Sequence, residues 1–297
     1  MKFLLPLLFF ISFSSLTDTK LLILGSGTPN PNPERFGSSY AVLVDETAYL
    51  VDFGPGVVRR ASALSSNWGG SFEALNPENL EYAFLTHIHS DHSAGLADLI
   101  LTPWVMGRNK KLKLFGPKEL GKMAMNVLDA YEKDINYRVE GSQPSNNIGY
   151  KIDFKDLKEG EVYKDSNISV EAFPVNHGGL RNSFGFRFKS KDKTIIFSGD
   201  TGPSKKLEEY SYNADILVHE VYSEEGFLKK TEDWQIYHKA HHTSTLEVAK
   251  LAKKVKPGKL VLSHILFWGS SPVEILREVQ ENYKGKVIIA EDLMVVD

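Results

Sequence analysis

The sequence predicts an α/β protein (α+β in some classification schemes) with an αββα architecture, in which two mixed β-sheets pack face to face and helices lie outside. Two observations lead to this prediction. In each half of the chain short apolar runs of strand length come first, and segments with apolar residues at helical spacing lie between or after them. Histidine and aspartate residues also stand directly after several of these apolar runs, where strands give way to loops.

Length and composition are compatible with one domain over residues 18–297. The chain has 297 residues, 42% of them hydrophobic, and a chain of this length buries roughly three quarters of its unfolded surface. The formal net charge is −3 and the pI is about 6.3, so no basic field attracts polyanions. Long nucleic acid is therefore not expected as a partner, whereas a small anionic ester is compatible with this composition. Without cysteine, a disulfide framework is excluded.

The first 17 residues are typical of a signal peptide. Lys2 supplies a positive charge, residues 3–13 are apolar, and residues 12–15 offer small side chains for cleavage. The apolar stretch is too short to span a bilayer, and a buried strand or an uncleaved interfacial helix are the alternatives. We expect export to the periplasm or the medium, with the cytoplasm as the alternative location, and no stable membrane span once the leader is removed.

The first half of the chain predicts strands at 20–24, 39–44, 47–51, 82–85 and 111–115, and helices at 57–64, 93–106 and 118–131. Residues 25–29, Gly-Ser-Gly-Thr-Pro, lack the lysine of a P-loop and are interpreted as a tight turn. Asp52 directly follows the third strand, so its carboxylate is expected at the edge where strand ends meet.

The second half predicts strands at 151–154, 168–175, 183–188, 194–198, 216–219, 260–263 and 287–290, and helices at 204–210, 244–255 and 272–283. Residues 67–77, 140–149 and 224–239 are expected to be loops, and substrate specificity is expected to reside in them. The third contains Phe227, Trp234, Tyr237 and His238, which are interpreted either as an aromatic lid or as part of a subunit interface.

A metal site is predicted where the strand at 82–85 ends. His87, His89, Asp91 and His92 fall within six residues, directly before a predicted helix. Imidazole and carboxylate ligands without thiolate suit zinc or a similar first-row metal ion. On such a loop His87 and His89 can point at one ion while Asp91 and His92 face a second.

Three further residues of the metal-binding types follow predicted strands. They are His177, Asp200 and His264. Each has a structural alternative, such as a histidine whose ring bonds to the backbone or an aspartate that caps a turn. Together with the first cluster, however, they supply enough ligands for two ions.

The order of these motifs resembles the metallo-β-lactamase superfamily, from about residue 20 to the C-terminus. Within it the chain looks most like the branch that contains ribonuclease Z, arylsulfatase-like hydrolases and anti-Pycsar cyclic-nucleotide phosphodiesterases. The resemblance implies an αββα sandwich with two Zn²⁺ ions, for which Mn²⁺ or Fe²⁺ are alternatives, and a homodimer. By this resemblance one ion is held by His87, His89 and His177, the other by Asp91, His92 and His264, and Asp200 bridges both. The di-iron flavoprotein branch has glutamate where this chain has His89, which disfavours redox chemistry.

A proton donor is predicted away from the metal ligands. Residues 219–222, His-Glu-Val-Tyr, and 242–244, His-Thr-Ser, resemble the ribonuclease Z segments in which a glutamate partners a histidine. The family alignment favours His242 over His241, and a polar helix N-terminus is the alternative. The predicted catalytic residues are Asp91, which orients the nucleophile or accepts its proton, and the pair Glu220 and His242, which protonates the leaving oxygen. Asp52 is expected to fix the tautomer of a ligand histidine.

The predicted function is therefore hydrolysis of a small phosphodiester or a cyclic nucleotide by a metal-activated hydroxide. An arylsulfatase-like sulfate-ester hydrolase and a ribonuclease Z-type endoribonuclease are the alternatives; a lactonase, a β-lactamase or a non-catalytic binding protein is less favoured. Between His177 and Asp200 the sequence predicts a compact hairpin, without the protruding arm by which ribonuclease Z grips tRNA. This difference, together with the expected export, disfavours tRNA processing.

Overall fold

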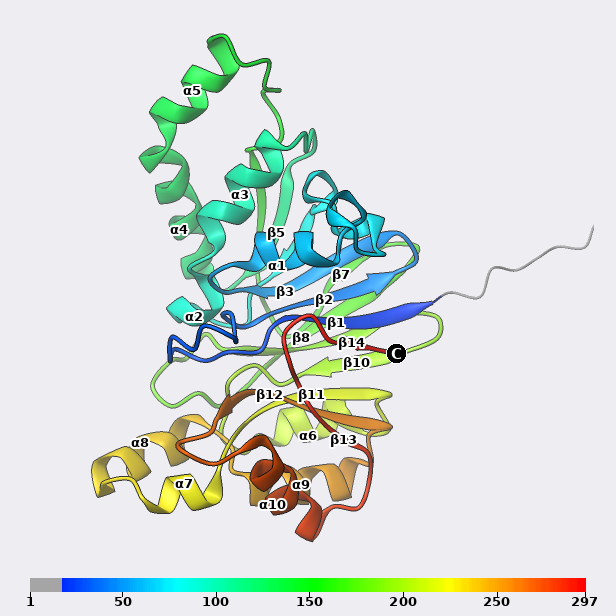
Figure 1. The fold of residues 1–297 in the computed structure, drawn as a ribbon, viewed down its shortest axis with the longest axis vertical. Coiled ribbons are helices and arrows are strands. Elements are labelled where there is room, and N and C mark those ends of the chain that lie inside the picture. Colours follow the sequence, from blue (N-terminus) through cyan, green and yellow to red (C-terminus); the bar gives the residue numbers. More distant parts are fainter. Residues whose placement is uncertain (1–17) are drawn as a thin grey trace, which may run out of the picture.

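The structure is a computed structural model that describes residues 18–297. Two seven-stranded β-sheets lie face to face, with helices α1, α3 and α4 on one side and α6, α9 and α10 on the other (Figure 1). The predicted αββα arrangement is confirmed. The predicted signal peptide, residues 1–17, lies outside the described residues and stays a prediction. Within residues 18–297 no helix has the length and apolar character needed to cross a membrane.

The first sheet has the strand order β14-β1-β2-β3-β4-β5-β6. Its antiparallel part runs from β14 to β3 and its parallel part from β3 to β6. The strands are β1 (Thr19–Gly25), β2 (Ser39–Val44), β3 (Thr47–Phe53), β4 (Tyr82–Phe84), β5 (Leu112–Gly116), β6 (Ile152–Asp156) and β14 (Val295–Val296).

The second sheet has the order β13-β12-β11-β10-β9-β8-β7, parallel from β13 to β10 and antiparallel from β10 to β7. The strands are β7 (Gly160–Lys164), β8 (Ser169–Pro174), β9 (Phe184–Lys189), β10 (Thr194–Phe197), β11 (Ile216–Tyr222), β12 (Lys259–Leu266) and β13 (Val287–Ile289). β9 and β10 form the compact hairpin that was predicted between His177 and Asp200.

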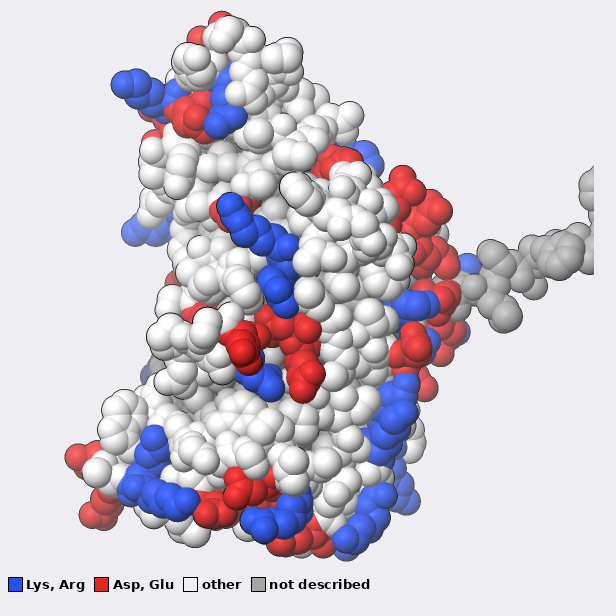
Figure 2. Space-filling model, viewed as in Figure 1, with Lys and Arg blue, Asp and Glu red and all other residues white. Residues whose placement is uncertain are grey.

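The helices occupy the segments between strands. The first half contains α1 (Val57–Leu64), α2 (Ser90–Ser93), α3 (Leu96–Val105), α4 (Lys118–Ala130) and α5 (Glu132–Glu140). The second half contains α6 (Lys205–Ser211), α7 (Glu224–Leu228), α8 (Glu232–His241), α9 (Thr245–Val255) and α10 (Pro272–Asn282). Figure 2 shows acidic and basic side chains interspersed over one face of the molecule, in keeping with the small net charge.

Alternation along the strands produces three hydrophobic layers. In β1, Leu21 and Ile23 belong to the cluster between the two sheets, whereas Leu22 and Leu24 belong to the cluster under the helices of the first half. Successive side chains of a strand point to opposite faces, so a buried strand must be apolar on both faces. This explains why β1 is a continuous apolar run. A third cluster lies between the second sheet and its helices.

Several elements differ from the sequence-based expectation. Residues 224–239 were expected to be a loop but form most of α7 and α8, and neither α5 nor β7 was expected. The physical reason is weak burial: α8 has no buried residue and α5 buries only Ile135. Without a buried face, these segments lack the apolar periodicity by which a helix is recognised in a sequence.

A buried arginine compensates for a proline inside α3. Pro103 has no amide hydrogen, so the carbonyl of Leu99 loses its usual helical donor. Arg108 donates to this carbonyl over 3.1 Å, and to the carbonyls of Leu80, Ile100 and Gly149 over 2.7 to 3.1 Å. Burial lowers the pKa of Arg108 to about 10, but the group stays charged near pH 7, and its donors are satisfied by the backbone.

Candidate metal centre

The residues predicted as ligands meet at one edge of the sandwich, and both sheets contribute. The segment after β4 carries His87 and His89, and α2 carries Asp91 and His92. The second sheet supplies three more, His177 after β8, Asp200 after β10 and His264 in β12. All seven except His89 are buried, and His89 is half-buried.

Two β-bulges aim side chains into this site. Asp52 is the extra residue where Ser39 pairs with Phe53 and Tyr40 pairs with Val51. His264 is the extra residue of β12 where Glu220 pairs with Ser263 and Val221 pairs with Ile265. Both have positive φ, 57° and 48°, and a bulge with such a residue changes the direction of its side chain. His264 was expected after the end of a strand; instead β12 continues beyond it to Leu266.

A close backbone approach brings α2 to the site. A Cβ atom on Gly54 would lie 2.2 Å from the carbonyl oxygen of Asp91, so only glycine allows the chain after β3 to contact α2 in this way.

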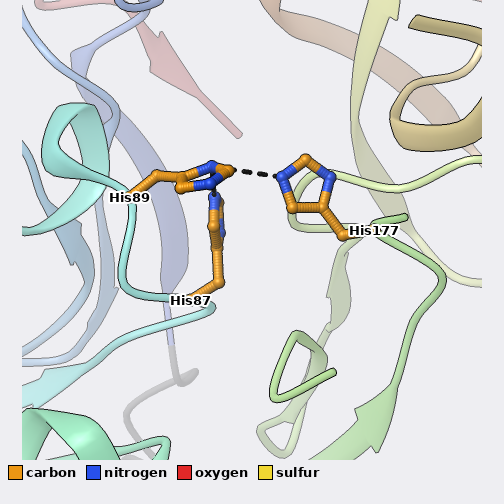
Figure 3. Close-up of side chains that lie close together, drawn as sticks. All are labelled: His87, His89 and His177. Carbon is orange, nitrogen blue, oxygen red and sulfur yellow. Dashed lines mark hydrogen bonds between the residues drawn. The ribbon is translucent and has the colours of Figure 1, made fainter. Parts of the chain in front are cut away.

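Three histidines converge on one point (Figure 3). His89 Nδ1 lies 3.1 Å from His87 Nε2 and 3.2 Å from His177 Nε2. These atoms form one of the clusters whose potential ligand atoms all lie within 4.8 Å of one another. The composition of this group agrees with the set of ligands that the resemblance implied for one ion.

A second group contains Asp91, His92 and His264, also within 4.8 Å of one another. Asp91 Oδ2 lies 2.9 Å from His264 Nε2 and 3.5 Å from His92 Nε2. Asp200 lies between the two groups: its carboxylate oxygens are 3.5 Å from His92 Nε2, 3.5 Å from His264 Nε2 and 3.9 Å from His87 Nε2. This placement suits a bridging ligand, which was the predicted role of Asp200.

The second ring nitrogens of three histidines are fixed by hydrogen bonds. His92 Nδ1 donates to Asp52 Oδ2 over 2.7 Å, and His177 Nδ1 donates to the carbonyl of His241 over 2.8 Å. Thr86 Oγ1 lies 3.0 Å from both His87 Nδ1 and Asp52 Oδ2, so it can accept from His87 while donating to Asp52. Each Nε2 atom is thereby left with a lone pair that faces the centre. Asp52 was predicted for this role; Thr86 was not, although its position directly before His87 was a signal.

The donor set fits divalent metal ions. Burial lowers the pKa of His177 to about 4 and that of His87 well below its ordinary value, so both imidazoles are neutral and can act as ligands. Burial also opposes protonation of His92, yet the carboxylates of Asp200, Asp91 and Asp52 raise its pKa well above the ordinary value. His92 Nε2 is buried and has no hydrogen-bond partner among residues 18–297. A cation would satisfy this atom and offset the excess negative charge.

Glu220 and His242, the residues predicted as the proton donor, also lie together. Glu220 Oε2 lies 3.3 Å from His242 Nδ1, while Glu220 Oε1 accepts from the amide nitrogens of Thr243 and Thr201 over 2.9 and 3.4 Å. His241 points elsewhere, with its Nδ1 bonded to the carbonyl of Tyr237. Burial raises the pKa of Glu220 well above its ordinary value and lowers that of His242 to about 4. Burial therefore favours the uncharged form of both groups.

A cavity of about 340 Å³ opens onto the centre. Its floor includes His89, Asp91, Asp200, His242 and His264. Its walls come from the loop after β1, from the α7–α8 connection and α8, and from the end of β12 and the segment after it. The wall residues are Pro29, Asn30, Lys230, Trp234, Tyr237, His238, Leu266 and Trp268. Lys230 and Trp268 were not singled out from the sequence; the place of Trp268 just after a histidine-bearing strand was the available signal.

Comparison with known families agrees with this geometry. A family model described as the beta-lactamase superfamily domain matches residues 47–265, which is more than half of the chain and includes every ligand-type residue described above. The chain belongs to the metallo-β-lactamase superfamily. It is accordingly a metal-dependent hydrolase, as the motifs implied.

Relatives in this superfamily include enzymes named ribonuclease Z. That of Mycobacterium bovis (strain BCG / Pasteur 1173P2) is 28% identical over 279 residues, covering 92% of this chain and 96% of the relative. That of Mycobacterium sp. (strain KMS) is 30% identical over 251 residues, covering 83% and 84%. The predicted resemblance to the branch that contains ribonuclease Z is confirmed.

Solved structures show the same fold. The metallo-β-lactamase fold protein YhfI from Bacillus subtilis has a TM-score of 0.71 at 18% identity, covering 94% of this chain and all of that one. Human tRNase Z, short form, has a TM-score of 0.67 at 20% identity, covering 94% and 98%. At these identities the likeness shows the fold alone.

Proposed function

We propose that this metallo-β-lactamase-superfamily hydrolase cleaves a small phosphodiester, such as a cyclic nucleotide, with two Zn²⁺ ions bound; Mn²⁺ or Fe²⁺ are alternative metals. The observation that carries the proposal is the Glu220–His242 pair, 3.3 Å apart, in which His242 lies in the cavity floor beside the metal ligands and Glu220 is buried behind it. A strained lactam or lactone needs little help with its leaving group, whereas an alkoxide that leaves from phosphorus does. The proposed metal ligands are His87, His89, Asp91, His92, His177, Asp200 and His264.

The bound ions would supply a hydroxide near neutral pH and neutralise an anionic substrate oxygen. The protein side chains would perform the remaining tasks. Asp91 lines the cavity and would orient the nucleophilic water or accept its proton. His242, in the cavity floor, would give a proton to the leaving oxygen, and Glu220 would hold the imidazole in position from the buried side. Asp52 and Thr86 would keep His92 and His87 in the tautomers that bind metal.

The test combines metal analysis with a panel of esters. We expect purified protein to contain zinc, manganese or iron and to hydrolyse a bis-aryl phosphate and cyclic nucleotides faster than an aryl sulfate, a lactone or a β-lactam. Because it removes the bridging carboxylate, Asp200→Ala should lower phosphodiesterase activity by about 10³-fold or more. Asp129→Ala, at an exposed position in α4, is the matched control. Metal-free protein together with full activity of Asp200→Ala would contradict the proposal, and a preference for the sulfate would favour the arylsulfatase-like alternative.

A ribonuclease Z activity is the second candidate, because relatives of that name align over most of the chain. A precursor tRNA with a 3′ extension, assayed beside a cyclic nucleotide, distinguishes the two. Preferential cleavage of the precursor at one position would replace the small-substrate proposal with endoribonuclease activity.

A further inference from the structure

α8 covers the cavity without being part of the hydrophobic core. None of its residues is buried, so packing against the core does not hold it in place. At its last residue the carbonyl of His241 accepts from His177 Nδ1 over 2.8 Å. The preceding helix α7 is held by the buried carboxylate of Glu278, which accepts from the amide nitrogens of Glu224 and Glu225 over 2.9 and 3.2 Å. The same carboxylate accepts from the hydroxyls of Thr245 and Ser223 over 2.5 and 3.1 Å. Three of these four hydrogen bonds hold α7 and its N-cap Ser223, and the fourth joins Glu278 to Thr245 of α9.

The face of α8 that lines the cavity is aromatic. Trp234, Tyr237 and His238 have the spacing i, i+3, i+4, which places them on one face of a helix. The rings of Trp234 and His238 are stacked, with centroids 5.4 Å apart and planes at 21°. Trp268, which enters from the segment after β12, lies with its ring centroid 4.4 Å from that of His238. These four side chains form the aromatic wall of the cavity.

Trp268 occupies its place at a conformational cost. Its φ is 45°, a left-handed conformation that is unfavourable for a bulky side chain and is found most often where function requires it. The chain around it is also tight, because a Cβ on Gly226 of α7 would lie 2.9 Å from Trp268 Cβ. Lys230 Nζ lies 4.7 Å from the ring centroid of Trp268 and brings a positive charge to the same wall.

The aromatic wall faces a polar floor across a cavity of about 340 Å³, a volume at the small end of the range for small-molecule sites. With cations bound to its carboxylates and imidazoles, the floor suits an anionic ester, and the aromatic wall suits a planar ring. His242 also lies on this side, 5.7 Å from His238 between ring centroids, which places the aromatic wall beside the leaving group.

We propose that the aromatic wall of Trp234, Tyr237, His238 and Trp268 binds the nucleobase of the substrate, so that the enzyme acts on nucleoside phosphodiesters. This inference rests on the proposed phosphodiesterase activity. The base stacks on the indole rings, Lys230 faces the negative charge of the nucleotide, and the phosphodiester lies over the floor. Stacking on an aromatic ring tolerates any base, so the wall selects nucleosides as a class.

The proposal can be tested with two cyclic esters, only one of which contains a nucleoside. In 3′,5′-cyclic AMP and in trimethylene phosphate the phosphorus belongs to the same six-membered ring, but only the former carries a base. Because one stacking contact is removed, Trp268→Leu and Trp234→Leu should each raise the KM of the metal-loaded enzyme for cyclic AMP about 5- to 150-fold. kcat for cyclic AMP and kcat/KM for trimethylene phosphate should stay within about twofold. Trp234 is 55% exposed, so its substitution is not expected to disturb folding.

The control is Trp68→Leu, which removes an indole that is 72% exposed and lines a different cavity. Equal losses on both esters, or no loss on either, would overturn the nucleobase subsite while leaving phosphodiesterase activity in place. A change of oligomeric state in Trp234→Leu with an unchanged KM would identify the wall as a subunit interface and would also overturn it.

Failure of the proposed function has a different outcome, since the wild type would then hydrolyse neither ester. The subsite is measured independently by calorimetry of AMP binding to the metal-loaded protein. The subsite is supported if the protein binds AMP and if Trp268→Leu and Trp234→Leu weaken this binding while Trp68→Leu does not. It is rejected if AMP does not bind or if none of these substitutions changes its affinity.

Discussion

Replacing Asp52 by asparagine tests how buried hydrogen bonds control metal affinity at this centre. Asp52 Oδ2 accepts from His92 Nδ1 and from Thr86 Oγ1, and Asp52 Oδ1 accepts from the amide nitrogen of Thr86 over 2.8 Å. Asparagine keeps the shape of the side chain, but one of its two terminal atoms is a donor. At least one of the three donors around it must therefore lose its acceptor.

The magnitude follows from the burial of this group. A buried donor left without a partner costs about 1 to 3 kcal/mol. Loss of the hydrogen-bond partner of a ligating histidine typically weakens metal binding about 10- to 100-fold, which corresponds to about 1.4 to 2.8 kcal/mol. The two estimates overlap, so we expect the dissociation constant for the metal to rise about 10- to 100-fold in Asp52→Asn.

Competition with a chromophoric chelator measures this dissociation constant directly. The matched control is Asp129→Asn, which makes the same chemical change at an exposed position of α4. Thr86→Val distinguishes the two histidines that Asp52 supports. It removes the hydroxyl that links Asp52 to His87 but leaves the hydrogen bond between Asp52 and His92, so we expect a smaller loss of metal affinity. A folded Asp52→Asn protein with wild-type metal affinity would refute the inference that Asp52 positions these histidines.

Two further predictions concern stability. Arg108→Met should lower the free energy of unfolding by roughly 3 kcal/mol or more, because it leaves several buried carbonyls without their charged donor. Urea denaturation measures this loss, and the control is Arg59→Met, at a side chain that is 81% exposed. Equal stabilities of the two variants would contradict the prediction. Burial lowers the pKa of His219 to about 4, so the unfolded chain binds more protons than the folded one between about pH 6.5 and 4. As the pH falls across that window, protonation of His219 should lower the free energy of unfolding of the metal-free protein by about 3 kcal/mol in total. In urea denaturation, the stability of His219→Asn should therefore depend less steeply on pH. If the stabilities of the wild type and His219→Asn fall in parallel with pH, His219 does not contribute this effect.

Strand and helix prediction succeeded where burial left a pattern in the sequence. β1, for example, is apolar at consecutive positions because its two faces enter two different clusters, and α9 has both a buried face and a capping box at Ser244 and Glu247. α8 has neither a buried residue nor a side-chain cap. The hydrogen bond that holds its last residue comes from His177, a residue far away in the sequence, so no local pattern reveals it.

The site was predictable in composition but not in its supporting contacts. The spacing of His87, His89, Asp91 and His92 and the placement of ligand types after apolar runs identified a metal centre. The contact of Thr86 with Asp52 joins residues 34 positions apart, and the cavity wall that contains Lys230 and Trp268 joins the α7–α8 connection to the segment after β12. Contacts between distant segments leave no periodic signal in either segment.

The sequence by itself determined the layers, the ligand types and the superfamily, because each depends on local alternation or on motif order. Only the tertiary structure decided how the ligands are aimed. Asp52 and His264 face the centre because each is the unpaired residue of a bulge with positive φ. The position of a bulge depends on the register between neighbouring strands, and the two strands of such a pair must meet before that register exists.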